Sequence, residues 1–312
     1  CWIESVRGYQ TPSDADVAKR TLRATAFLDP ALVEYLDNHK LANLWAARRT
    51  LLDPRQWLKS GRRLGATDRA VLAETKQALA TLRDVGASAP HAYTGIPYST
   101  DFFCQSVKNL DWSVPWAAGG QAAILCFLAA SEIPKVKGQQ EAALIQRELV
   151  DLLSRYCDSS SGAYCGGNRP QPHGMLVNGA MKVITGLRWL GQPIHHPRAL
   201  VDTVLAKPPD ADGCHIVDAI YTLYECAKET DYKTSCIQDF MVHALGEIKK
   251  HKKPDGGFSY YRDRAQTSYY GVLVSVGLCE SDIHGTMLLS WATVMAARLI
   301  GQNKPTWRLI QP

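Results

Sequence analysis

Several signatures of common enzyme classes are missing from this 312-residue sequence. It has no glycine-rich loop followed by Lys and Ser or Thr, no serine in a GxSxG elbow, and no HxxxH or HExxH pair of histidines. These absences argue against nucleotide hydrolysis, serine hydrolysis and a zinc site built on one helix face. We therefore expect neither a cofactor nor a metal ion.

The nine cysteines include no CxxC pair, and their number is odd. Several lie in apolar helical contexts such as ILCFL and LYECA, which is typical of reduced, buried thiols. The cysteines therefore favour a cytoplasmic protein. A lipoprotein whose mature chain begins at Cys1 is the alternative.

The charge distribution is also unremarkable. The formal net charge is +5, from 35 Lys and Arg against 30 Asp and Glu, and the basic residues form no stripe, so we expect no nucleic-acid partner. The longest uncharged run, 113–131, contains Pro, Gly-Gly and Gln. That composition predicts a buried helix and no membrane span.

The hydrophobic pattern predicts an all-α chain. Residues 1–100 read as an N-terminal helical extension, with charged amphipathic helices at about 14–27, 31–49 and 68–85, followed by a long ordered loop over 90–112. Residues 101–312 read as a helical-repeat core that forms one compact unit with the extension. In this core, apolar helices at 116–131, 175–190, 215–227 and 286–300 alternate with more amphipathic or mixed helices at 140–156, 197–206 and 236–251. A small β-hairpin is expected near 258–270, around the polar turn RDRAQ.

Two of the apolar helices begin alike. His173-Gly174 opens HGMLVNGAMKVITGLRWLG and His284-Gly285 opens HGTMLLSWATVMAARLIG, each after a glycine-rich loop, GAYCGGN or DGGFSYY. Repeated helical units stack, so equivalent positions come to lie side by side. We therefore expect the polar residues at the helix starts to gather at one mouth.

With DGGFSYY before an apolar helix and the helix pairs repeating, residues 112–301 resemble the α/α-toroid superfamily of terpenoid cyclases, protein prenyltransferases and several polysaccharide-acting enzymes. The resemblance implies an (α/α) toroid of inner and outer helices. The cyclase acid motif DxDD is absent, and Asp212, Cys214 and His284 lack the pattern that flanks a prenyltransferase zinc site. The segments NLDW, SYYRDRAQTSYYG and ESDIHGT also look like those of bacterial proteins from polysaccharide gene neighbourhoods.

The residues near the expected mouth carry carboxylate, imidazole, phenol and guanidinium groups, which are the components of general acid–base catalysis. The residues expected to be catalytic are His284, Asp282, Asp218, His173, Tyr261 and Tyr270. The residues expected to bind substrate are Trp112, Asp111, His215, Glu280, Arg262, Arg264 and Tyr269.

Each candidate also has a structural interpretation. Asp282 suits a helix N-cap, the two repeated histidines suit hydrogen bonds to neighbouring carbonyls, and the tyrosine pairs suit packing. Asp218 stands one turn inside an apolar helix, so it faces either a cavity or a cationic partner.

We expect a carbohydrate-active enzyme that acts on a polysaccharide or glycan intermediate as a lyase, epimerase or hydrolase. A uronate lyase or epimerase would use a histidine base and an arginine for the substrate carboxylate, whereas a hydrolase would use a carboxylate pair. One alternative is an isoprenoid cyclase or prenyl-transferring enzyme. The other is a non-catalytic scaffold that binds a glycan or a partner protein.

Overall fold

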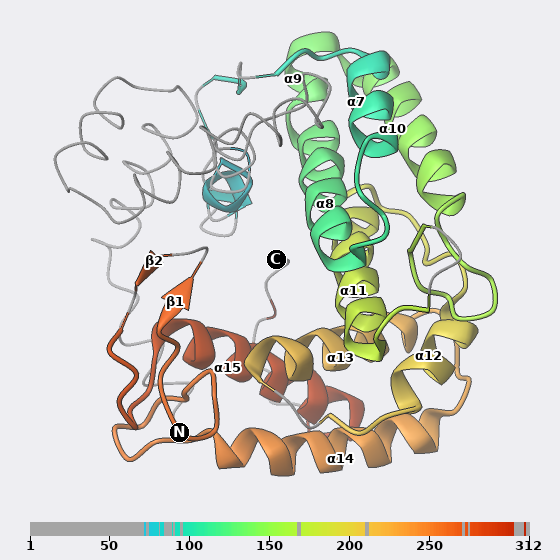
Figure 1. Ribbon diagram of the computed structural model, residues 1–312. Coiled ribbons are helices and arrows are strands. Elements are labelled where there is room, and N and C mark those ends of the chain that lie inside the picture. Colours follow the sequence, from blue (N-terminus) through green and yellow to red (C-terminus); the bar gives the residue numbers. More distant parts are fainter. Residues whose placement is uncertain are drawn as a thin grey trace, which may run out of the picture.

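The described part of the chain is mostly helical (Figure 1). The computed structural model describes residues 96–166, 170–209, 212–269, 272–273 and 275–302, together with scattered positions between 72 and 93 and Leu309. The elements are α7 (Thr100–Lys108), α8 (Pro115–Ser131), α9 (Ile133–Lys137), α10 (Gln139–Ser154), α11 (His173–Trp189), α12 (Pro197–Leu205), α13 (Gly213–Cys226), α14 (Thr234–Lys250), β1 (Ser268–Tyr269), β2 (Val272–Leu273) and α15 (Ile283–Leu299). The all-α prediction is confirmed.

Four helices form an inner row in chain order. α8 packs on α11, α11 on α13, and α13 on α15. The amphipathic helices lie on the outside of this row, with α10 against α8, α12 against α13, and α14 against α15. Figure 1 shows α8 and α11 standing upright, while α13, α14 and α15 run across below them.

The inner and outer helices differ in burial as their sequences predict. α8 is buried on most sides, whereas α10 buries one stripe formed by Ala142, Ile145, Leu149, Leu152 and Leu153. Each fully buried Leu or Ile contributes about 1.5–3 kcal/mol to stability relative to an exposed one. The seven predicted helices of the core are all present, with ends within about three residues of the expected ones.

Glycines let α8 and α11 approach closely. A Cβ on Gly119 would lie 2.6 Å from the Gly179 carbonyl oxygen and 3.2 Å from the Lys182 Cβ. Because no larger residue fits there, the base of the Lys182 side chain is held in place by α8. This contact matters for the site described below.

The predicted loop over 90–112 is wrong, because it contains α7. Ser99 caps this helix by accepting the Phe102 N–H at 3.2 Å, and Phe103 and Val107 are buried one turn apart. The cap and the i, i+4 apolar pair are sufficient for a nine-residue helix. The Pro, Gly and Ser residues before α7 predict turns, and they outweighed the cap and the apolar pair in the sequence.

The β-hairpin lies further along the chain than predicted. β1 and β2 pair antiparallel, Ser268 with Leu273 and Tyr269 with Val272, so RDRAQ precedes the hairpin and does not form its turn. The backbone around Tyr260 bonds instead to the starts of α13 and α15. Those groups are therefore not available to a strand partner.

Only some of the N-terminal predictions can be compared with the structure. The expected helices at 14–27 and 31–49 lie outside the described residues, and the described positions within 68–85 are helical. The division at residue 100 stays a prediction. Among the described residues, one stretch, Pro115–Lys137, is apolar and long enough to cross a membrane, but 67% of its apolar window is buried in the fold, so it gives no clear membrane span.

Candidate active site

The start of α13 is built around Asp212. Its Oδ1 accepts the His215 backbone N–H at 3.2 Å, lies 2.9 Å from His215 Nδ1, and accepts the Tyr260 hydroxyl at 3.1 Å. Burial raises the pKa of the Asp212 carboxyl, but the hydrogen bonds and charge of His215 outweigh burial and leave the pKa below its ordinary value. Asp212 is therefore ionised at neutral pH and orients the His215 ring.

The start of α15 is built around Asp282 in the same way. Its Oδ1 accepts the Gly285 N–H at 2.6 Å, which is the N-cap bond. Its Oδ2 accepts the backbone N–H groups of Tyr260 at 2.7 Å and Gln266 at 3.0 Å. Asp282 therefore fastens the loop that carries Tyr260 onto the helix.

Tyr260 joins the two helix starts. Its ring stacks on His284 with centroids 5.2 Å apart and planes at 14°, while its hydroxyl reaches Asp212. A Cβ on Gly285 would lie 2.3 Å from the Tyr260 nitrogen, so only glycine admits this approach. His284 Nδ1 lies 2.7 Å from Gln266 Oε1, and burial lowers the pKa of His284, which keeps its imidazole neutral at pH 7.

The starts of α11 and α8 complete the group. A Cβ on Gly174 would lie 2.8 Å from His215 Cδ2, so the imidazole packs directly on α11. The Trp116 ring of α8 meets the same imidazole edge-on, with centroids 6.0 Å apart. The starts of α11, α13 and α15 therefore lie together, while α8 begins against the middle of α11, where Pro115 packs on Gly179.

Asp218 lies one turn deeper in α13 and is fully buried. Neither carboxylate oxygen has a hydrogen-bond partner, and Lys182 Nζ of α11 is 3.9 Å from Oδ1. Burial raises the pKa of Asp218 to about 6, against the attraction of Lys182 and His215 and with a small addition from Asp212. This carboxyl can therefore gain or lose a proton near neutral pH.

Cys214 stands beside Asp218 but offers no thiolate. Burial raises the pKa of its thiol to about 12, so it stays protonated at neutral pH. Among the described residues, no group of three or more His, Cys, Asp and Glu side chains is gathered to hold a metal ion.

Four of the predicted site residues thus come together: His215, Asp218, Asp282 and His284. We call these, with Asp212, Tyr260 and Lys182, the mouth cluster. Asp282 and Asp212 also serve as the N-caps that the structural interpretation gave them.

Other predicted residues have partners elsewhere. His173 Nε2 bonds the Thr203 carbonyl at 2.8 Å, the carbonyl contact that its structural interpretation gave. Trp112 is buried, with its ring stacked on Tyr156 at 4.4 Å. Asp111 caps the turn at Ser113.

The predicted arginines do not reach the mouth cluster. Arg262 pairs with the buried Glu247 of α14 at 2.6 Å, and Arg264 pairs with the exposed Asp263 at 2.9 Å. Arg264 also covers the Tyr261 ring, 4.9 Å from its centroid. Glu280 is exposed, Tyr269 belongs to β1, and Tyr270 lies outside the described residues.

Three members or neighbours of the cluster were missed by sequence reasoning. Asn178 and Lys182 interrupt the apolar middle of α11 one turn apart, and that interruption was the available signal. Gln266 gives no sequence signal, since a glutamine in a polar loop is ordinary.

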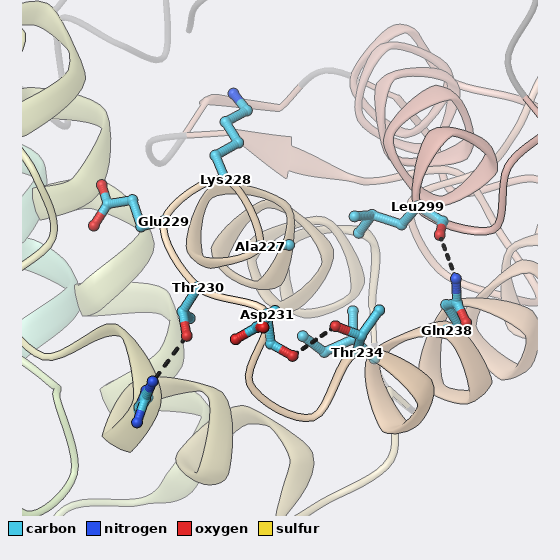
Figure 2. A pocket seen from close by; sticks show the side chains of 10 residues that line it. Ala227, Lys228, Glu229, Thr230, Asp231, Thr234, Gln238 and Leu299 are labelled. Atoms are coloured by element: carbon cyan, nitrogen blue, oxygen red, sulfur yellow. Dashed lines mark hydrogen bonds between the residues drawn. The ribbon is translucent and has the colours of Figure 1, made fainter.

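A pocket of about 570 Å³ lies at the C-terminal ends of α13 and α15, away from the mouth cluster (Figure 2). Its polar groups bond to one another: Arg198 to Thr230, Thr234 to the Asp231 carbonyl, and Gln238 to the Leu299 carbonyl. It contains none of the predicted site residues.

Comparisons with protein-family models, with characterised proteins and with solved structures find no match to this chain.

Proposed function

We propose that the mouth cluster is the active site of a carbohydrate-active enzyme that works by general acid–base catalysis on a glycan. We also propose that the inner row and its outer helices belong to an (α/α) toroid, with the active site at the N-terminal ends of the inner helices.

The observation that carries this proposal is Asp218. A buried carboxyl without hydrogen bonds destabilises a fold, so such groups concentrate where proton transfer needs them. A pKa of about 6 suits an acid or base that works near pH 7.

The other members have complementary roles. We assign His284, which burial keeps neutral, the role of a base, with its ring oriented by the Nδ1 contact with Gln266 Oε1. Lys182 is one-third exposed, and its charge acts on both Asp218 and His284. Lys182 therefore takes over the substrate-carboxylate role that the sequence assigned to Arg262 and Arg264. A base beside a cation matches proton abstraction next to a carboxylate, as in a uronate lyase or epimerase.

One observation favours the isoprenoid alternative. Tyr221, three residues after Asp218, packs on Trp291 of α15 with ring centroids 5.0 Å apart. A protonated carboxyl beside aromatic faces could start and stabilise a carbocation.

The test is turnover on a panel of polysaccharides, with and without uronate residues, followed by new reducing ends and by the ultraviolet absorbance of unsaturated products. We expect Asp218→Asn and His284→Ala to lower turnover by about two to four orders of magnitude. Asp202→Asn, on the exposed pair with Lys233, is the control and should leave turnover unchanged.

Two outcomes contradict the proposal. Cyclisation of a polyprene, with no activity on any glycan, selects the isoprenoid alternative. Turnover that survives both substitutions removes the mouth cluster as the active site, and binding without turnover of either substrate class selects the scaffold.

A further inference from the structure

Asn178, in the middle of α11, is a second buried polar group without a partner. It is fully buried, and neither its Nδ2 nor its Oδ1 has a hydrogen bond. The proposed function leaves this residue without a role. A buried amide normally has its hydrogen bonds satisfied, and each exception calls for an explanation.

The helix register places Asn178 opposite Asp218. α11 meets α13 at two points: at Gly174, which packs on His215, and at Arg188, whose Nε donates to Glu225 Oε2 at 2.6 Å. Both contacts advance in chain order, so the two helices run in the same direction. Asn178 is one turn beyond Gly174 on the same stripe of α11.

Asp218 is close to one turn beyond His215 on the facing stripe of α13. Lys182, one turn beyond Asn178, reaches Asp218 at 3.9 Å, which agrees with this register. The two unpartnered groups therefore lie at the same depth, one turn below His215 and Gly174.

Access to this level runs past side chains that reach water. The Lys182 side chain is 32% exposed and that of His215 is 36% exposed, whereas Asp218 below them is 1% exposed. Lys182 is long and flexible, so rearranging it costs little compared with moving a helix. A shift of Lys182 toward a substrate carboxylate would open the way from His215 to Asn178 and Asp218.

We propose that Asn178 is a specificity-determining residue that binds a hydroxyl group of a sugar substrate opposite Asp218. This inference rests on the proposed function and names the group that the site recognises. An amide offers an acceptor and two N–H donors, so a hydroxyl can donate to one of the facing groups while accepting from the other. A substrate carboxylate at this position would repel Asp218, whose charged neighbours are Lys182, His215 and Asp212.

The test compares Asn178→Leu with Met181→Leu. Leucine has the branching of asparagine and no polar atoms, although it is larger. Met181 is a buried neighbour on the same helix, and its sulfur makes only a weak 3.8 Å contact with the Thr185 hydroxyl, which also donates to the Met181 carbonyl. Without ligand, Asn178→Leu should raise the thermal midpoint, because it removes unpartnered polar atoms from the core. Met181→Leu should leave the midpoint close to that of the parent. A clear drop in the midpoint of both Asn178→Leu and the smaller Asn178→Val would show that the amide has a structural partner and would overturn the inference.

Binding is then measured with D-glucose and D-glucuronate as the probes. Sugars stabilise proteins non-specifically by exclusion from the surface, so only the difference between variants counts. We expect at least one probe to raise the midpoint of the parent and of Met181→Leu more than that of Asn178→Leu. Equal shifts in all three proteins, with either probe, would overturn the inference.

The inference and the proposed function fail in different ways. If Asp218→Asn loses turnover while Asn178→Leu keeps the KM and turnover of the parent, the active site stands and Asn178 has no part in specificity. If Asp218→Asn keeps full turnover, the proposed function itself fails.

Discussion

Replacing Asp218 by Asn should make the protein more stable at neutral pH. Burial raises the pKa of this carboxyl from the ordinary 3.8 to about 6. At about 1.36 kcal/mol for each pH unit, ionising it in the folded state costs about 3 kcal/mol of stability above pH 6. Asparagine has nearly the same shape and no charge, so Asp218→Asn removes that cost.

The direction of the pH dependence follows from the raised pKa. Below pH 3.8 the carboxyl is protonated in both the folded and the unfolded chain, so it makes no difference to stability. Between 3.8 and about 6 the unfolded chain releases its proton first, and the parent loses stability as the pH rises. The advantage of Asp218→Asn should therefore be near zero at about pH 4 and approach about 3 kcal/mol at about pH 8.

Urea unfolding of the parent and the variant across this pH range measures the effect. His195, His251 and His284 have pKa values lowered by burial, so they weaken the fold as the pH falls through 6.5. They do so in both proteins, and the difference between the two isolates Asp218. The exposed control Asp202→Asn should stay within about 0.5 kcal/mol of the parent at every pH.

Two results would refute this reasoning. A loss of about 3–5 kcal/mol at pH 8 would mean that Asp218 neutralises Lys182 as half of a tight buried ion pair. An unchanged free energy of unfolding at all pH values would mean that the carboxyl reaches water.

Three further predictions concern the frame of the site. Gly285→Ala should destabilise by about 1–3 kcal/mol in thermal unfolding, because its Cβ would overlap loop backbone at 2.3 Å, whereas Gly246→Ala, with open space around it, should be neutral or stabilising. Glu225→Ala should cost about 3 kcal/mol in urea unfolding, because this carboxylate is 3% exposed and pairs with a guanidinium of α11 at 2.6 Å; a cost below about 1 kcal/mol would contradict a buried pair. Alkylation followed by mass spectrometry should modify Cys236 and Cys279 before the other described cysteines, and early labelling of a buried thiol would contradict the packing.

The helices could be predicted from the sequence because their determinants are local. Apolar residues at a period of 3.6, with a capping Asp three residues before the Gly or His N–H that it accepts, specify α13 and α15 from within one or two turns. The prediction of a loop over 90–112 was wrong because it also relied on local signals. The turn residues there gave a stronger signal than the short helix α7. The repeat also led us to expect that the helix starts gather, and those of α11, α13 and α15 do, although His173 bonds the Thr203 carbonyl.

The partners of the polar side chains were decided by the tertiary structure. Nothing within a few residues of Lys182 shows that it reaches Asp218, 36 positions later, or that Tyr260 links Asp212 to His284. The sequence likewise predicts that Arg262 binds substrate, whereas in the fold Arg262 pairs with Glu247 near the end of α14. Helix formation depends on contacts one turn apart, whereas the choice of an ionic partner depends on how whole helices cross. The sequence alone therefore determined which helices carry polar residues, and the packing of the helices decided which of those residues meet.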